Sequence, residues 1–486
     1  MSDTLKQKTA KGLFWGALNS GTTQVLNLII GICLARMLTK ADYGIVGVLT
    51  IFTAIAGDLQ SAGFTQGLVN IKHPETRDYN SVFSFNVFMS ILMYAILFFS
   101  APLIAAFFRQ PCLTEVSRVL FLTFVIASLG IAHGGYMTKN MMNREMAVIG
   151  AASLVASGTV GITLALLGKG YWALAWQQIA YIAVLNFGRY YYVREWRPRL
   201  TLDMTPVKCM APFALKILVT KIVNTVSGNI LTVIFGRLFP IAQVGSYSQA
   251  YKWDTMASSL VSNTVGQIAQ AVLVEADGDK AEDDHTRQLR VYRKMTRFTC
   301  FLAMPLMFGL ASVAREFILI TIGAEWEACV PLLQALCVSG AFLPVYTMYQ
   351  NLAISRGRSD VYMWLNIFQI ILQISVILAF YRYGMYVMVC AYSAFMILWL
   401  LPWHHYAGRL IRYRWTDMLK DVAPFVLSAA VVMALTYVVT YPLSSIWLLI
   451  TARIFLAAIL YYAIMKAARV EILCECEKFI LKKLER

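Results

Sequence analysis

Lysines placed inside apolar segments are the residues of this sequence best suited to chemistry. Residues 209–236 are largely apolar, yet one side of the helix they would form is polar: Lys216, Thr220, Lys221, Asn224, Thr225, Ser227 and Gly228. The other side is aliphatic at helical spacing. A charge deep in an apolar medium costs roughly 2.5–3.5 kcal/mol, so it needs water or an anion. Lys216 could instead extend its stem toward a polar boundary, whereas Lys221 lies a turn deeper.

The apolar segment 241–268 repeats this arrangement. Lys252 shares a narrow helical arc with Ser248, Ser259, Asn263 and Gln270. We therefore expect a hydrated basic cavity lined by side chains from both segments, namely Lys216, Lys221, Asn224, Ser248, Lys252 and Asn263. Such a cavity suits an anionic group, for example a diphosphate.

Two acidic residues also fall inside apolar segments. Asp58 shares a polar stripe with Thr50 and Ser61 in the segment 41–66. Asp254 points about 200° around its helix from Lys252, so the two cannot pair locally. Asp254 needs a cation from another helix or its own access to water. Either acid could bind a proton or a sodium ion, or serve only in the structure. No cofactor is expected, and no cysteine spacing suggests a metal site.

The remaining polar and aromatic residues of the apolar segments have structural interpretations. We expect Arg118 and Arg453 to lie exposed at a membrane rim. Six amides are typical of hydrogen bonding between helices: Gln177, Gln178, Asn186, Asn366, Gln369 and Gln373. Five tryptophans are predicted to be interface aromatics: Trp172, Trp176, Trp364, Trp399 and Trp403.

Composition indicates where these segments reside. The chain has 486 residues, of which 59% are hydrophobic and 14% charged, and its mean hydropathy is +0.63. Soluble domains carry about 25% charged residues. The chain is therefore expected to be an integral membrane protein in contact with lipid. Its net charge of +16 could suit nucleic acid, but the basic residues occupy short loops between apolar runs, so no nucleic-acid partner is expected.

The apolar runs predict an all-α protein that crosses the membrane fourteen times, since about 20 residues suffice for one crossing. The predicted spans lie near 12–37, 41–66, 80–105, 113–138, 145–167, 170–192, 209–236, 241–268, 291–313, 328–352, 360–381, 384–406, 422–441 and 445–466. Most of the 42 Lys and Arg residues fall on one side when both termini are placed in the cytoplasm. This distribution favours that orientation.

A repeated phrase divides the spans into halves. Leu34-Ala-Arg36-Met-Leu-Thr-Lys-Ala41-Asp-Tyr-Gly44 is echoed by Phe235-Gly-Arg237-Leu-Phe-Pro-Ile-Ala242-Gln-Val-Gly245. Each copy joins two apolar spans, which predicts two six-helix lobes of equal orientation related by a pseudo-two-fold along the membrane normal. The predicted parts are an N-terminal lobe, a cytoplasmic linker, a C-terminal lobe, and a terminal hairpin with a basic tail, at 1–189, 190–208, 209–408 and 409–486.

Several short patterns make the chain resemble the polysaccharide transporter family of the multidrug/oligosaccharidyl-lipid/polysaccharide flippase superfamily. The resemblance covers nearly the whole chain. The patterns are Lys11-Gly-Leu-Phe-Trp15, the first copy of the repeated phrase, Gly57-Asp-Leu59 to Gly63-Phe64, Arg287-Gln-Leu-Arg290, Ile322-Gly-Ala-Glu-Trp326 and Pro331-Leu-Leu-Gln334-Ala-Leu. Ile322 replaces the aromatic residue of the family pattern.

The resemblance implies a bacterial inner-membrane flippase that moves undecaprenyl-diphosphate-linked oligosaccharide toward the periplasm for capsule, O-antigen or exopolysaccharide. It implies two lobes plus a hairpin, no catalytic motif, and a polysaccharide polymerase and chain-length machinery as partners. One alternative is a cation-coupled multidrug exporter of the same superfamily, which the hairpin and the basic cavity disfavour. Another is a membrane enzyme such as a polymerase or ligase, which the short outer loops disfavour.

Overall fold

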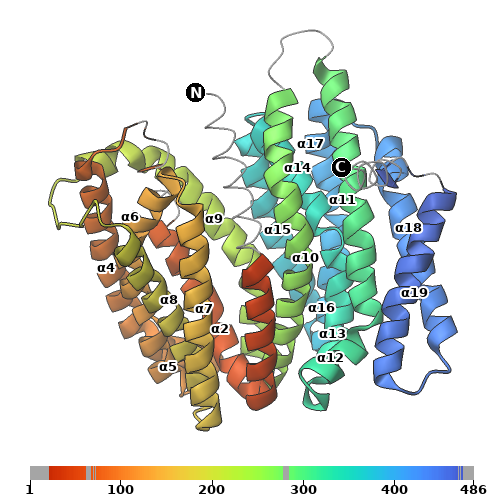
Figure 1. The fold of residues 1–486 in the computed structure, drawn as a ribbon, viewed down its shortest axis with the longest axis horizontal. Helices are drawn as coiled ribbons and strands as arrows, with labels where there is room; N and C mark the ends of the chain where they lie inside the picture. The colour runs from red at the N-terminus through yellow and green to blue at the C-terminus, as the bar shows by residue number, and fades with distance from the viewer. Residues whose placement is uncertain are drawn as a thin grey trace. The chain divides into compact units, whose positions relative to one another are not determined.

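The fold is known from a computed structural model that describes residues 21–61, 67–68, 71, 73–276, 284–468, 470 and 472–473. Every regular element in that part of the chain is helical (Figure 1). After a short apolar helix, Gly21–Met37, the elements are α2 Lys40–Ser61, α4 Thr76–Phe108, α5 Leu113–Leu120, α6 Leu122–Lys139, α7 Asn143–Leu166, α8 Tyr171–Tyr192, α9 Thr205–Leu238, α10 Ile241–Ala276, α11 Asp284–Ser312, α12 Ala314–Thr321, η1 Ala324–Trp326, α13 Cys329–Gly340, α14 Leu343–Ser355, α15 Ser359–Ala379, η2 Tyr381–Tyr383, α16 Met385–Leu398, α17 Leu400–Gly408, η3 Arg409–Ile411, α18 Trp415–Thr440 and α19 Ile446–Ala467.

Ten helical stretches of the described chain are long and apolar enough to cross a membrane. Each coincides with a predicted span, so the prediction of a multi-pass all-α membrane protein is confirmed. The predicted spans near 170–192, 209–236 and 241–268 are also helices, namely α8, α9 and α10. They fall outside the ten, a count that covers the described residues alone, and parts of α9 and α10 lie outside those residues. Part of the predicted first span is the short helix Gly21–Met37.

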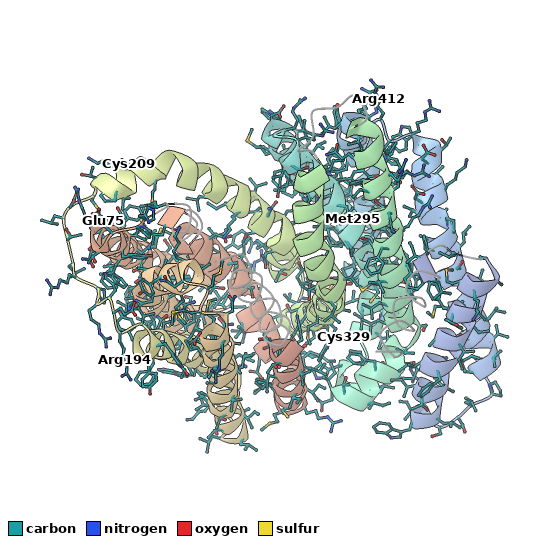
Figure 2. All side chains as sticks on the ribbon, turned by 45° about the horizontal axis from the view of Figure 1, so that its top comes forward. Glu75, Arg194, Cys209, Met295, Cys329 and Arg412 are labelled. Carbon is teal, nitrogen blue, oxygen red and sulfur yellow. The ribbon has the colours of Figure 1, made fainter. Side chains whose placement is uncertain are left out.

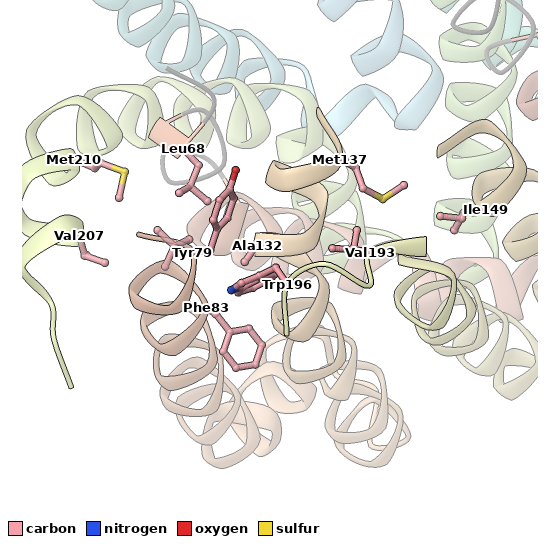
Figure 3. Packing of buried hydrophobic residues seen from close by; sticks show 11 residues of the cluster. Leu68, Tyr79, Phe83, Ala132, Met137, Ile149, Val193, Trp196, Val207 and Met210 are labelled. Atoms are coloured by element: carbon pink, nitrogen blue, oxygen red, sulfur yellow. The ribbon is translucent and has the colours of Figure 1, made fainter. Parts of the chain in front are cut away.

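The chain forms two compact units, residues 1–248 and 249–486. In the first unit, the segment 193–204 between α8 and α9 runs without helix, and we call it the strap. Val193 and Trp196 of the strap are 1% and 5% exposed, and Figure 3 shows Trp196 beside Tyr79 and Phe83 of α4. The strap is thus part of the hydrophobic core of this unit, although it lies in the segment predicted to be a linker.

Polar contacts fix the strap to the first turns of α4. The Trp196 indole and the Arg199 amide both donate to Asn80 Oδ1, at 3.2 and 3.0 Å. Asp203 pairs with Arg77, and this contact holds the pKa of the Asp203 carboxyl well below its usual range. Figure 2 labels Arg194 in the strap and Glu75 just before α4. The strap therefore leads the chain into α9 along a defined path.

The two copies of the repeated phrase break their helices at matching places. In the first copy, one helix ends at Met37 and α2 begins at Lys40. In the second copy, α9 ends at Leu238 and α10 begins at Ile241. The two breaks are therefore 201 residues apart. In the first copy, Thr39 and Asp42 cap α2 reciprocally, because each side chain accepts a hydrogen bond from the other's amide, at 3.3 and 2.9 Å. In the second copy, Pro240 precedes α10, where its missing N–H costs nothing.

In the second unit, α11 packs against α18 and α13, and α18 and α19 form an antiparallel hairpin (Figure 1). Asp421 of α18 is fully buried, and its carboxylate accepts hydrogen bonds from Arg293 and Arg297 of α11 at 2.6–3.1 Å. Tyr413 donates to the same carboxylate at 2.9 Å. Tyr413 lies just after Arg412, which takes a left-handed backbone conformation before α18 (Figure 2). The hairpin is therefore anchored to α11.

Candidate functional site

The polar face of α9 is the first part of the candidate site. Lys221 and Asn224 are exposed along this helix, and Thr225 lies one turn from Lys221. The Thr225 hydroxyl donates a hydrogen bond to Asp58 of α2, so the structure brings the predicted acid of the first half to this face. Lys221 has no carboxylate partner among the described residues. The side chain of Lys216 lies outside the described residues, although its backbone is in α9.

Lys252 of α10 is partly buried and likewise has no carboxylate partner in the described part of the chain. Its ammonium group lies 5.6 Å from the ring centroid of Trp253, within the range of a cation–π contact. One turn earlier, the buried Ser248 hydroxyl has no hydrogen-bond partner. The side chain of Asn263 lies outside the described residues. Lys252 therefore carries a cation that no described protein acid neutralises.

Asp254 faces away from Lys252, as its helical angle predicts, and packs against α13. Asp254 is 7% exposed, and its Oδ1 has no hydrogen-bond partner among the residues that the structure describes. A Cβ on Gly340 of α13 would lie 2.4 Å from that oxygen, so only glycine permits this approach. Sequence reasoning missed Gly340. An orphaned carboxylate oxygen in an apolar setting favours the protonated acid or a bound cation.

Arg453 is not at an exposed rim, and that prediction was wrong. It is 6% exposed, and its guanidinium lies 3.1 Å from the Glu316 carboxylate, also 6% exposed. The same guanidinium donates to the Thr440 hydroxyl at 3.1 Å and to the Ser312 carbonyl at 2.9 Å. The pair therefore joins α19 to α11, α12 and α18. Sequence reasoning also missed Asp421, although an acid directly before an apolar span was a usable signal.

Three of the predicted interhelical amide contacts are present, those of Asn186, Asn366 and Gln369. The Asn186 amide donates to the carbonyl of Ile126 on α6, and the Tyr346 hydroxyl donates to Asn366 at 2.9 Å and to Gln369. The tryptophan prediction is only partly right. Trp176 and Trp364 are exposed, but Trp399 and Trp403 are 7% and 0% exposed and belong to the core. Trp403 packs edge-on against Tyr346, which explains its burial.

The cations of the helices fall into two groups, those paired with a protein acid and those without a described acid. Arg293, Arg297 and Arg453 are neutralised by protein acids and fasten helices together. Lys221 and Lys252 lie on polar helix faces, and neither has a carboxylate partner among the described residues.

Comparison with known proteins bears on the family and the fold of the chain. The family model described as "Polysaccharide biosynthesis protein" matches residues 33–331. The lipopolysaccharide biosynthesis protein WzxC of Escherichia coli (strain K12) is 25% identical over 381 residues, 77% of this chain and 75% of the relative. The succinoglycan biosynthesis transport protein ExoT of Rhizobium meliloti (strain 1021) is 25% identical, with 75% and 73% covered. The lipid II flippase MurJ, in an inward closed conformation, shares the fold with a TM-score of 0.76 at 13% identity, over 94% of this chain and 99% of MurJ.

Proposed function

Because this chain belongs to the family of polysaccharide biosynthesis proteins, within the polysaccharide transporters of the flippase superfamily, we propose that it is a lipid-linked oligosaccharide flippase. It would move undecaprenyl-diphosphate-linked repeat units from the cytoplasmic to the periplasmic leaflet of the bacterial inner membrane. The product would feed a capsule, O-antigen or exopolysaccharide. A polysaccharide polymerase and chain-length machinery would act next on the delivered units.

The proposal rests on two lysines, Lys221 and Lys252, that lie on polar faces of consecutive helices. Neither has a carboxylate partner among the described residues. A diphosphate or an acidic sugar would supply the charge that the protein does not. Lysine suits this task because its ammonium is a mobile point charge that can follow a moving headgroup. The lipid tail would remain in the bilayer, so only the headgroup would need a polar path.

Transport would proceed by alternating access, with both termini in the cytoplasm. The excess of Lys and Arg in the segments assigned to the cytoplasm supports this orientation. The protein would catalyse no covalent reaction, which is consistent with relatives that are named as transport proteins. A cationic site also fits an anionic headgroup better than the cationic drugs of a multidrug exporter.

Energy could come from a coupling cation bound at an acid. Asp254 is the stronger candidate, because its Oδ1 is buried without a partner, whereas Asp58 accepts a hydrogen bond from Thr225. A proton or a sodium ion bound at Asp254 would give this buried oxygen a partner. An imposed gradient of the coupling ion should then drive transport in wild-type vesicles and fail to drive it in Asp254→Asn.

Deletion of the gene followed by glycan analysis tests the proposed function. We expect the surface polymer to disappear while lipid-linked repeat units accumulate on the cytoplasmic side. A plasmid copy of the wild-type gene should reverse both effects. Unchanged surface glycan together with increased sensitivity to cationic drugs would contradict the proposal and favour the multidrug exporter.

A further inference from the structure

Two leucines of the strap are exposed. Leu200 is 76% exposed and Leu202 is 96% exposed, although leucine side chains are usually withdrawn from water. Figure 1 shows the strap, which joins α8 to α9, at the edge of the first unit beside α4. Two exposed leucines so close together indicate a contact with another apolar medium rather than with water.

Hydrogen bonds to α4 hold the strap on both sides of Leu202. The Thr201 amide donates to Ser84 Oγ at 2.8 Å. The Ser81 hydroxyl donates to the Asp203 carbonyl at 2.7 Å. Because both neighbours of Leu202 are bound to α4 in this way, the leucine side chain stays outside for as long as the strap is docked.

The same contacts place the leucines at membrane depth. Ser84 lies eight residues after Thr76, where α4 begins, which is about 12 Å along the helix at 1.5 Å per residue. Ser84 also lies within the predicted span 80–105, and α4 is long and apolar enough to cross a membrane. Asp203 pairs with Arg77, so the strap has returned to the first turn of α4 by that residue. The strap therefore dips along α4, and its leucines lie in the deepest part.

The strap also presents cations that no described acid neutralises. Three of its arginines are exposed: Arg194, Arg197 and Arg199. None of them has a carboxylate partner among the residues that the structure describes, and two of their guanidinium groups donate to backbone carbonyls in the last turn of α8, at 3.2 Å each. The acids of the strap are already engaged, since Glu195 accepts a hydrogen bond from Tyr136 and Asp203 pairs with Arg77.

We infer that the strap is a lipid-binding element that inserts Leu200 and Leu202 into the membrane and binds anionic phospholipid headgroups with its three arginines. The arginines lie near helix ends and the leucines lie deeper, which matches the order of phosphates and acyl chains in a leaflet. Arginine also binds phosphate in a bidentate manner. In the proposed orientation this is the cytoplasmic leaflet, whose anionic lipids attract basic segments. Lipid binding at the strap is independent of the transported substrate.

Fluorescence quenching in nanodiscs of phosphatidylglycerol and phosphatidylcholine tests the insertion. In a chain whose nine native cysteines are replaced, a bimane label would be attached at Leu202→Cys and, as a second reading, at Leu200→Cys. Thr76→Cys is the matched control, because Thr76 is also exposed but lies where α4 begins. Lipid brominated in its acyl chains should quench the label in the strap and spare the control, and aqueous iodide should do the opposite.

Two results of this experiment would overturn the inference. Iodide quenching at all three positions would show that the strap faces water, which would favour a cytoplasmic protein as its occupant. Equal quenching of all three labels by brominated lipid would show that the strap is no deeper than the start of α4.

The identity of the brominated lipid tests the arginines. Bromine would be carried by phosphatidylglycerol or by phosphatidylcholine, at the same fraction of the same mixture. Each arginine near an anionic surface strengthens the attraction about fivefold, so brominated phosphatidylglycerol should quench the label at Leu202→Cys more strongly. High salt should reduce this difference, because it screens exposed charges. Equal quenching by the two lipids at low salt would overturn the inference.

A triple variant assigns that difference to the strap. It carries Arg194→Gln, Arg197→Gln and Arg199→Gln, and it should lose the preference for phosphatidylglycerol. The matched control removes the same charge from exposed arginines between α17 and α18: Arg409→Gln, Arg412→Gln and Arg414→Gln. The control should keep the preference at the label, and an equal preference in both variants would overturn the inference. These measurements require no transport, so they stand or fall separately from the proposed function.

Discussion

Arg453 and Lys252 are both cations within the helices of the second unit, yet their surroundings differ. Arg453 is enclosed by Glu316, Thr440 and the Ser312 carbonyl. The Lys252 ammonium lies over the face of Trp253 and has no carboxylate partner among the described residues. A cation matched by a protein acid holds the structure together and leaves nothing for a ligand. A cation left without one reduces stability, and we propose that a ligand binds it.

The largest expected loss of stability follows Arg453→Ala. The variant leaves the Glu316 carboxylate buried without its cation, which should cost about 3–5 kcal/mol. Thermal unfolding in detergent would show this as a lower midpoint. Replacing both partners, as Arg453→Met with Glu316→Leu, should be much milder, because no orphaned charge remains. A double variant as unstable as the sum of the two single variants would contradict the assignment of a coupled pair.

A smaller loss is expected for Asp421→Asn. The substitution keeps the shape of the side chain but removes the charge that Arg293 and Arg297 bind. Both arginines are partly exposed and can turn to water. Each lost charged hydrogen bond is worth about 1.5–3 kcal/mol, so the net loss should be near the lower end of that range. Limited proteolysis before α18 checks whether the hairpin has loosened; unchanged protection would show that this carboxylate is not an anchor.

Gly340→Ala should destabilise by about 1–3 kcal/mol, the usual cost of overpacking a filled site. The added methyl would displace the Asp254 carboxylate, which lies against the glycine. Gly309→Ala in α11 is the matched control, since its nearest neighbour is the Met433 Cε at 3.6 Å, an ordinary contact. Comparison of the two unfolding midpoints checks the prediction, and equal midpoints would refute the close packing at Asp254.

Lys252→Ala should change stability least and function most. Loss of an unmatched charge should leave the unfolding midpoint within the small range of ordinary substitutions, about 0.5 kcal/mol. Export of the surface polymer should nevertheless fall sharply, and Lys221→Ala should behave in the same way. The combined variant should abolish export at normal protein levels. Near-normal export in that variant would remove both lysines from the proposed site.

The sequence anticipated the elements that depend on hydropathy alone. All ten apolar spans coincide with predicted ones, and the repeated phrase marks two helix breaks at equal spacing. These features are local, because each is set by the residues of one segment. The polar faces of α9 and α10 follow from helical periodicity for the same reason.

Features that depend on a distant partner could not be predicted in this way. Arg453 was expected at a rim because Glu316 lies 137 residues away in the chain. Trp403 was expected at an interface because nothing local reveals that Tyr346 packs on it. The close approach of Gly44 to Ile241 likewise depends on how helices pack, although the repeat had already drawn attention to both residues.

Leaflet accessibility of a lipid-linked sugar tests the central claim most directly. Purified protein would be reconstituted into vesicles that contain undecaprenyl-diphosphate-linked oligosaccharide, and an impermeant glycosidase added outside would report how much sugar faces outward. The account predicts that wild-type protein lets the enzyme reach sugar from both leaflets and that the Lys221→Ala, Lys252→Ala variant leaves the inner pool protected. Equal protection in vesicles with wild-type protein, with the double variant and with no protein would contradict it.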